Sequence, residues 1–220
     1  MNDAVQVLQS VLDNPVTGIP WSSNAVKAMK PTLLKEGHRT YPVIVFIGDP
    51  GSGKTTIAEN LILYGEEDMD NPDDRHFFIT TDYTESKMKK ICKKRRDDIL
   101  IIDDFADFKG YNARSKVKDY LDGIVRPSFA GESAMLVLTV ETPVIKMITD
   151  SLKSRVIIIN VNKWKEMPDS EQILIGLRRN RNTLCELMDE FREWSSEKSF
   201  DVFNRKLSFR KRKKEWADET

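Results

Sequence analysis

Residues 48–55 read GDPGSGKT and match the pattern G-x-x-x-x-G-K-[ST]. Glycines at this spacing let backbone N–H groups converge on an anion, because no Cβ blocks the approach. A lysine placed here reaches the β- and γ-phosphates of a nucleotide, and the hydroxyl that follows can bind magnesium. The predicted nucleotide-binding residues are Gly48, Asp49, Pro50, Gly51, Ser52, Gly53, Lys54, Thr55 and Thr56.

A second group of candidate residues follows an apolar run, in the segment ILIIDDF at 99–105. A run of this kind is typical of a strand buried on both faces of a parallel sheet, and such strands deliver their last residues to the edge where ligands bind. Asp103 is then placed to hold magnesium, directly or through water. Asp104, one residue later, is predicted to orient or deprotonate the attacking water.

The elements around these motifs alternate between strands and helices. A β-branched and aromatic run at 41–47 precedes the glycine-rich turn, and a helical pattern at 55–64 follows it, so the helix N-terminus faces the anion. The predicted strands are 41–47, 76–81, 98–103, 134–140 and 156–161, and the intervening helices are 55–64, 85–96, 116–125 and 143–152. This alternation predicts an α/β three-layer sandwich with a five-stranded, mostly parallel sheet.

Helical segments flank this core on both sides. Residues 1–40 read as two short helices, 3–12 and 23–35, and residues 41–165 form the predicted phosphate-loop core. From 170 to 194 apolar residues recur with a period near 3.6, which indicates a helical appendage with one buried face. We therefore expect three parts: a helical segment 1–40, the core 41–165, and an appendage 166–220 that ends in a basic tail.

Composition excludes several classes of function. The 220 residues carry 35 basic and 35 acidic side chains, so no global field draws the chain to nucleic acid or membrane. The two isolated cysteines and two histidines have no spacing typical of a zinc site, a disulfide framework or a Ser/His/Asp triad. The apolar runs are strand-sized and the N-terminus lacks the pattern of a secretory signal, so we expect a cytoplasmic chain without a membrane span.

Taken together, GDPGSGKT and ILIIDDF resemble the Walker A and Walker B motifs of the additional-strand P-loop ATPases. The segments AMLVLTVET at 134–142 and SLKSRVIII at 151–159 are similar to stretches of AAA+ ATPases that carry a sensor and an arginine. The paired aspartates resemble those of the replication initiators, helicase loaders and transposition ATPases. The resemblance covers about residues 41–161 and implies an ATPase that uses ATP and Mg²⁺ and assembles into oligomers.

The same resemblance implies roles for further residues. Arg155 is the expected finger that reaches the nucleotide of a neighbouring subunit, and the alternative is an arginine that caps a helix C-terminus. The sensor is Thr139, Glu141 or Thr142, of which we count Glu141 among the catalytic candidates although the family usually has asparagine or a hydroxyl there. A second sensor arginine is sought among Arg178, Arg179 and Arg181, whose alternative is an exposed charged helix face.

Two basic clusters suggest a nucleic-acid partner. One lies in the predicted helix 85–96 and the other in the tail 205–214, which is flanked by Phe203 and Trp216. Lysine and arginine would neutralise phosphates, and the aromatic rings would stack on bases, although a solvated charged surface explains both clusters as well.

Three functions remain open on these grounds. The first is an AAA+-like ATPase that acts on DNA, or on a replication or mobile-element partner, through nucleotide-dependent assembly. The second is a small P-loop kinase that transfers the γ-phosphoryl group to a small acceptor, and the third is a nucleotide-gated binding module. ATP is favoured over GTP, because the segment NVNKW at 160–164 lacks the aspartate of the guanine-reading pattern N/TKxD.

Overall fold

A parallel β-sheet forms the centre of the computed structural model, which describes residues 2–14, 16–35, 43–62, 76–79, 84–104, 113–141, 154–162 and 164–197. Four strands of five to seven residues form its body: β1 (Val43–Gly48), β3 (Ile99–Asp103), β4 (Met135–Glu141) and β5 (Val156–Asn160). The three-residue β2 (Phe77–Ile79) pairs with β3 at one edge. The order is β2-β3-β4-β1-β5, so β4 lies between β1 and β3.

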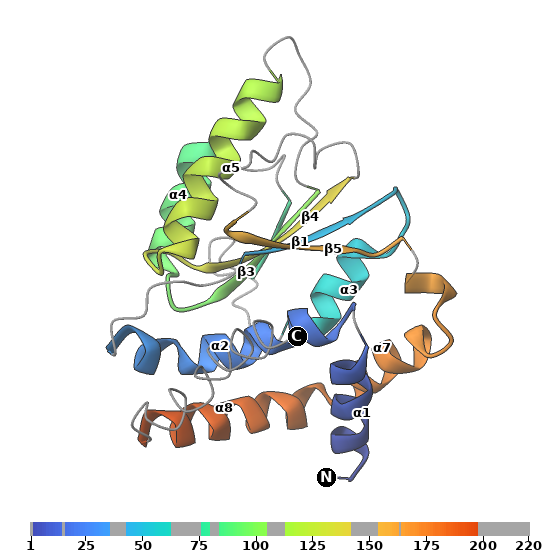
Figure 1. Cartoon of the computed structure of the whole chain (residues 1–220). Helices are drawn as coiled ribbons and strands as arrows, with labels where there is room; N and C mark the ends of the chain where they lie inside the picture. Colours follow the sequence, from blue (N-terminus) through green and yellow to red (C-terminus); the bar gives the residue numbers. More distant parts are fainter. Residues whose placement is uncertain are drawn as a thin grey trace, which may run out of the picture.

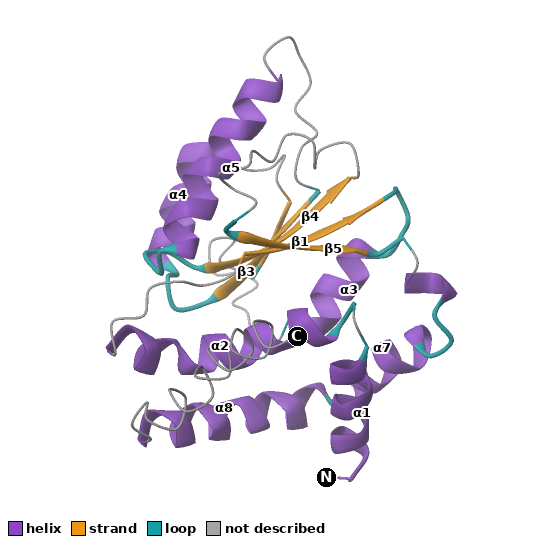
Figure 2. Cartoon of the chain, viewed as in Figure 1, coloured by secondary structure: helices purple, strands orange, loops and turns teal. Residues whose placement is uncertain are grey.

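Helices cover both faces of this sheet (Figures 1 and 2). One face carries α4 (Glu85–Lys94) and α5 (Ala113–Phe129), and the other carries α3 (Lys54–Leu61) and α2 (Gly18–Lys35). Beyond α2 and α3 lie α1 (Asn2–Asp13), α7 (Ser170–Arg179) and α8 (Arg181–Glu197). Helix α2 packs along α8, and α1 packs against α7 and α2, so elements from the two ends of the described chain lie side by side.

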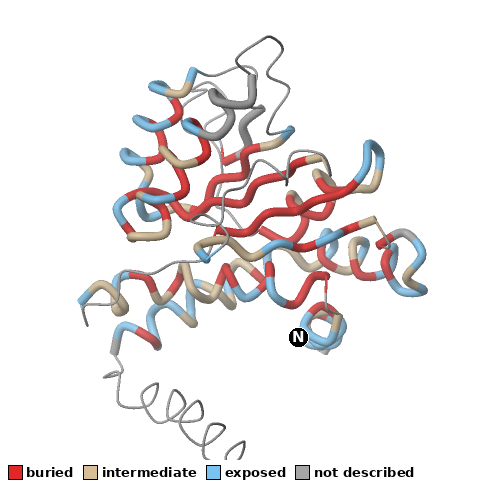
Figure 3. Tube along the Cα trace, turned by 45° about the horizontal axis from the view of Figure 1, so that its top comes forward, coloured by how far each residue is buried: buried red, intermediate tan, exposed pale blue. Residues whose placement is uncertain are grey.

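The three inner strands, β3, β4 and β1, are buried on both faces because their apolar residues serve two cores, whereas β5 at the edge is only partly buried (Figure 3). On β1, Val43, Val45 and Ile47 pack with α4 and α5, whereas Ile44 and Phe46 pack with α3 and the helices beyond it. All six residues of β1 are buried. An uninterrupted apolar run therefore gives a central parallel strand, as the sequence pattern indicates.

The structure corrects several predicted boundaries. Of the predicted second strand 76–81, the structure describes Phe77–Ile79 as β2, and residues 80 and 81 lie outside the described residues. The described sheet therefore has four strands of five to seven residues and a three-residue edge strand rather than five of similar length. Helix α5 is longer than the predicted 116–125 because it extends to Phe129, with Pro127 in its last turn. The predicted helix 143–152 and the basic tail 205–214 lie outside the described residues.

The helix predicted at 23–35 begins five residues earlier, at Gly18. Pro20 is compatible with this start because the first turn of a helix needs no backbone N–H donor. A Cβ at Gly18 would lie only 2.5 Å from Leu12 O, so glycine allows the close turn out of α1. Residues 18–22, which lie outside the predicted helix, thus belong to it.

The single helical pattern predicted for 170–194 divides into α7 and α8 at Asn180. The Asn180 side chain donates hydrogen bonds to Gly176 O at 3.0 Å and to Asp3 Oδ2 at 3.1 Å. Asparagine often bonds nearby backbone in this way and so interrupts a helix. The apolar periodicity continues through the break, which explains why the sequence pattern does not reveal it.

Within the described residues, none of the helices has the length and apolar character required to cross a bilayer.

Candidate functional site

The GDPGSGKT segment connects the end of β1 to the start of α3 as a tight loop. Its turn is closed by the Ser52 N–H, which donates to Asp49 O at 3.1 Å. Gly51 and Gly53 have φ angles of 74° and 93°, in the left-handed region that favours glycine. A Cβ at Gly48 would collide with Ser52 Oγ, so the first glycine is required by space rather than by φ.

Lys54 lies at the first position of α3 and is only 8% exposed. Its ammonium group donates to Gly48 O and to Asp49 O, each at 3.0 Å. These bonds hold the positive charge against the loop, beside the N-terminus of α3, whose unpaired N–H groups favour anions. The loop therefore combines the two features that phosphate binding requires, a fixed cation and a helix N-terminus.

Ser52 adds a further sign that the loop is shaped for a ligand. Its Oγ is buried, and no hydrogen-bond partner for it exists among the described residues. A buried hydroxyl without a partner costs free energy, of the order of 1–3 kcal/mol. A phosphate oxygen in the loop would accept this hydrogen bond, so the residues present fit a bound phosphate group.

Asp103 connects the loop to the neighbouring strands. Its Oδ1 accepts a hydrogen bond from Thr55 Oγ1 at 2.8 Å and another from Thr139 Oγ1 at 2.5 Å. Thr55 comes from α3, Asp103 from the end of β3 and Thr139 from β4. Hydroxyl and carboxylate oxygens are the ligands that Mg²⁺ prefers, so the Thr55–Asp103 pair fits this ion.

Asp104 follows directly and has an unusual backbone. Its φ of 52° is the only positive value among the described residues other than glycine. The backbone N–H of Asp104 donates to Thr139 Oγ1 at 2.9 Å, and the residue is exposed. The sheet edge thus presents two successive carboxylates, one fixed by threonine hydroxyls and one reaching solvent.

Glu141 ends β4 at the same edge, because it is the register partner of Gly48. It is partly exposed, whereas Thr139, two residues earlier, is 1% exposed and bonded to the Asp103–Asp104 pair. Thr142, the third sensor candidate, lies outside the described residues. Of the two candidates that the structure describes, Thr139 is the one hydrogen-bonded to Asp103 and Asp104.

Arg155 is not brought to this edge. It precedes β5, and the register pairs Val156 with Val43, at the end of β1 opposite Gly48. A strand of six residues separates these ends by about 16 Å. The Arg155 guanidinium carbon lies 5.7 Å from the centre of the Phe129 ring. Within one chain, Arg155 therefore lies at the far edge of the sheet from the loop.

The arginines proposed as a second sensor contact the far end of α3. Arg178 Nε donates to Asn60 Oδ1 at 2.8 Å, and Arg181 donates to Glu59 O and Ile62 O at 3.3 and 3.1 Å. Arg179 is exposed. Two of the three candidates thus bind the C-terminal part of the helix that begins at Lys54, where positive charge is favourable.

Glu59 lies in the C-terminal half of the same helix, where the charge of Asp103 still acts on it. Burial raises its pKa above the ordinary value, the charge of Asp103 raises it further, and Arg178 acts in the opposite direction. No sequence motif indicates this residue, because its position is set by the packing of α3 against β3.

Asn162 is a second residue that the sequence analysis did not select. Its Oδ1 accepts a hydrogen bond from the Asp49 N–H at 2.7 Å, and its Nδ2 donates to Asp49 Oδ2 at 3.3 Å. Asn162 follows β5, which neighbours β1, so it holds the loop from the adjacent strand. The available signal was a polar residue just after a strand end, a pattern too common to single it out.

Comparisons with known proteins agree with this arrangement. Residues 32–176, well over half of the chain, match the sequence model of a family described as novel STAND NTPase 3 (nSTAND3). No curated protein shows significant similarity to the chain.

Among solved structures, one described as the active helicase Cch of SCCmec type IV superposes with a TM-score of 0.51 and 12% identity. The match covers 91% of this chain and 42% of that one, so this chain spans less than half of the helicase. A RuvB variant of Thermotoga maritima gives a TM-score of 0.35 and 17% identity, covering 80% of this chain and 67% of that chain. At such identities the likeness to the helicase concerns the fold.

Proposed function

The chain belongs to the novel STAND NTPase 3 family, and from this premise we propose that it binds ATP with Mg²⁺ at the 48–56 loop and hydrolyses it. The observation that carries the proposal is the hydrogen-bonded group Thr55, Asp103 and Thr139 beside the Lys54 ammonium. A phosphate cradle and a set of hard oxygen ligands thus meet at one sheet edge.

Each residue has a proposed part in the reaction. The loop N–H groups and Lys54 bind and orient the phosphates, and Ser52 Oγ donates to a phosphate oxygen. Thr55 and Asp103 would hold magnesium, which supplies charge neutralisation on the transferred phosphoryl group. Asp104 accepts the proton of the attacking water, and Glu141 is a second acid at the same edge.

ATP is the proposed nucleotide rather than GTP. The proposal rests on the sequence 160–164, NVNKW, which lacks the aspartate that reads a guanine base. Hydrolysis of ATP and GTP under the same conditions tests this point directly.

Action on DNA through assembly is the broader part of the proposal. It is supported by the outer surface of α4, where Lys87, Lys90 and Lys94 are exposed while Met88 and Ile91 are buried. The basic tail 205–214 would add charge, and Arg155 would reach a neighbouring subunit or a partner protein from the opposite sheet edge. The helicase neighbour makes DNA a reasonable first substrate to test.

The test is phosphate release from ATP with Mg²⁺ and no added acceptor. We expect turnover in the wild type, loss of nucleotide binding in Lys54→Ala, and unchanged turnover in Lys35→Ala, an exposed lysine at the end of α2. ATP binding without phosphate release would contradict the ATPase proposal. Phosphate transfer to a small acceptor in its place would identify a kinase.

Assembly and DNA binding are measured separately. Light scattering with and without ATP and Mg²⁺ should show nucleotide-dependent growth in mass that Arg155→Ala reduces. A fluorescent oligonucleotide should bind with an affinity that falls steeply as salt rises, and Lys90→Glu should weaken it. A monomer under all conditions, or binding indifferent to salt, would contradict these two parts of the proposal.

A further inference from the structure

A cavity lies at the opposite edge of the sheet from the 48–56 loop. It has a volume of about 390 Å³ and is enclosed by α2, α8 and the residues that lead into β2 and β3. Asp98 lines it, whereas Asp103, at the other end of β3, belongs to the predicted magnesium site. Five residues of extended strand separate the two by about 16 Å. The cavity is therefore distinct from the nucleotide site.

Most of the charges around this cavity are paired. Asp189 Oδ1 lies 3.0 Å from Arg192 Nη2 on α8, and Asp98 Oδ2 lies 2.9 Å from Arg95 Nε. Lys30, which is 1% exposed, donates to Ser133 O at 3.2 Å, and Asp97 is the acid that acts on it most strongly. Asp97 Oδ2 also lies 3.7 Å from Arg96 Nε. Arg192, Arg95, Arg96 and Lys30 thus each have an ion pair or a hydrogen bond.

His76 also lines the cavity but adds no charge to it. Its Nδ1 lies 3.0 Å from Ile99 O and its Nε2 lies 2.7 Å from Arg95 Nη2. Because a guanidinium only donates, Nε2 must accept and Nδ1 must carry the proton. Burial and the charge of Arg95 also lower the pKa of His76, so the imidazole is neutral.

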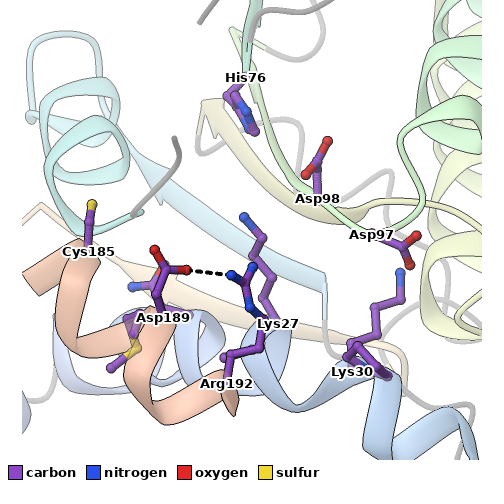
Figure 4. A pocket seen from close by; sticks show the side chains of 12 residues that line it. Lys27, Lys30, His76, Asp97, Asp98, Cys185, Asp189 and Arg192 are labelled. Atoms are coloured by element: carbon purple, nitrogen blue, oxygen red, sulfur yellow. Dashed lines mark ion pairs between the residues drawn. The ribbon is translucent and has the colours of Figure 1, made fainter. Parts of the chain in front are cut away.

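Lys27 is the remaining cation. Figure 4 shows its ammonium group extending from α2 into the space between α8 and the sheet. No hydrogen bond or ion pair joins this group to another described residue, although Asp98 and Asp189 attract it from a distance. Burial opposes its charge and lowers its pKa. A bound anion would compensate this charge where the surrounding side chains do not.

The rest of the wall is apolar or weakly polar. Ala28 and Pro31 come from α2, and Met188 and Cys185 come from α8. Pockets for small molecules commonly combine such a lining with a few placed polar groups, at volumes of roughly 300–1,000 Å³. The cavity is thus suited to a ligand with one charged end and an apolar body.

We propose that this cavity binds a small organic anion, whose carboxylate or phosphate group pairs with Lys27 and whose apolar part lies against Pro31 and Met188. The two sources of the charged group share the same chemistry, and benzoate and phenyl phosphate serve as probes for them. This site does not depend on nucleotide hydrolysis, so Lys54→Ala should retain it.

The first test is binding of each probe, followed by NMR of the protein labelled with ¹³C in its methionine methyl groups. Titration should shift the Met188 signal, identified with Met188→Leu, to saturation. Lys27→Gln should weaken binding at least tenfold, and Lys35→Gln, the same charge change on the exposed end of α2, should not. The tighter probe identifies carboxylate or phosphate as the preferred group.

The second test uses Cys185, whose pKa is raised by burial, while the charge of Arg181 and, less strongly, that of Lys27 act in the opposite direction. Its thiolate displaces iodide from iodoacetate or iodoacetamide, forming a C–S bond, and the two reagents differ in charge but hardly in size. Mass spectrometry of the Cys185 peptide gives the ratio of the two rates. Lys27→Gln should lower the iodoacetate-to-iodoacetamide ratio about tenfold, and benzoate should protect the wild type. Dividing the rates removes any general effect of the substitution on thiolate formation.

The proposal is overturned if neither probe shifts Met188, or if Lys27→Gln binds them as the wild type does. An iodoacetate preference that survives Lys27→Gln would also overturn it, by assigning the attraction to another cation. A thermal unfolding transition that is unchanged in Lys27→Gln shows that the fold is intact in these measurements.

Discussion

Thr139 Oγ1 lies 2.5 Å from Asp103 Oδ1, and the same hydroxyl accepts the Asp104 N–H at 2.9 Å. One side chain of β4 therefore positions both acids at the end of β3. The strand order makes this possible, because β4 lies between β3 and the strand that carries the phosphate loop. A hydroxyl at this place can link the Asp103 carboxylate to the backbone of Asp104.

The Thr139 hydroxyl can be removed with little change of shape by Thr139→Val. We expect hydrolysis to fall at least tenfold, because the Asp103 carboxylate loses a donor and the Asp104 N–H loses its acceptor. Urea unfolding should show a loss of about 1–3 kcal/mol, since Thr139 is buried. Thr139→Ser keeps the hydroxyl and should retain most activity. Equal turnover in the valine and serine variants would argue against a positioning role.

Asn162 should set the affinity of the loop for nucleotide rather than the rate of chemistry. Its side chain holds Asp49 through both a donor and an acceptor. Asn162→Ala removes both bonds, and we expect nucleotide to bind about tenfold more weakly, which corresponds to about 1.4 kcal/mol. Equilibrium binding of a fluorescent nucleotide measures this change.

Asn162→Asp provides the matched control for this pair. It keeps the acceptor for the Asp49 N–H but replaces the donor by a second carboxylate beside Asp49, so binding should again weaken. The effect should diminish as salt rises, because the repulsion is partly screened at this exposed position. Binding unchanged in both variants would mean that the loop holds its form without Asn162.

The sequence predicted the parts of the site that lie next to each other in the chain. The loop from Gly48 to Thr56 and the Asp103–Asp104 pair are local patterns, so their place at strand ends follows from the order of strand, turn and helix. The parallel α/β fold is predictable for the same reason. Asn162 was missed because its role depends on which strands become neighbours, and Glu59 because its place near Asp103 depends on how α3 packs against β3. No local pattern reveals either.

Helix boundaries were harder to predict where the residue types indicate one boundary and the backbone geometry or a side-chain hydrogen bond sets another. Gly18 and Pro20 lie outside the predicted helix 23–35 but open α2, since the first helical turn tolerates both. Asn180 divides α7 from α8 through a side-chain hydrogen bond to the backbone, which the spacing of apolar residues does not reveal. The charges around Lys27 come from α2, α8 and the strand entries, so that cavity was also invisible in the sequence.

Stability should depend on pH through His76. Burial and the charge of Arg95 lower its pKa below the ordinary value of 6.5. As pH falls through 6.5 the unfolded chain takes up a proton that the folded chain refuses, so stability is present above this pH and is lost below it. We expect the wild type to lose about 1 kcal/mol more than His76→Gln between about pH 7.5 and about pH 5.5.

Urea unfolding of both proteins at the two pH values measures this difference. Other groups titrate equally in the two proteins, including Glu59, whose raised pKa changes stability in the opposite direction as pH rises. Subtracting the variant from the wild type therefore isolates the imidazole. Parallel pH profiles would show that His76 takes up its proton equally readily in the folded and unfolded chain.

Asp104 allows the chemistry of the carboxylate to be separated from its backbone conformation. Asparagine tolerates the left-handed region at least as well as aspartate, whereas alanine there costs about 1 kcal/mol. Asp104→Asn should therefore leave the free energy of unfolding unchanged while hydrolysis falls by roughly 10²–10⁴-fold, the usual contribution of a general base. Asp104→Ala should lose both activity and stability, and Asp104→Gly should lose activity without loss of stability, because glycine adopts a φ of 52° freely.

Single-turnover hydrolysis and urea unfolding of the three variants, with nucleotide affinity measured beside them, distinguish the two effects. If Asp104→Asn retained wild-type hydrolysis while Asp104→Ala lost it, the backbone at the end of β3 would matter and the carboxylate would not. Glu141, which also lies at this edge as the partner of Gly48, would then be the acid to test as the base. Loss of turnover in all three variants with affinity preserved would assign the proton transfer to Asp104.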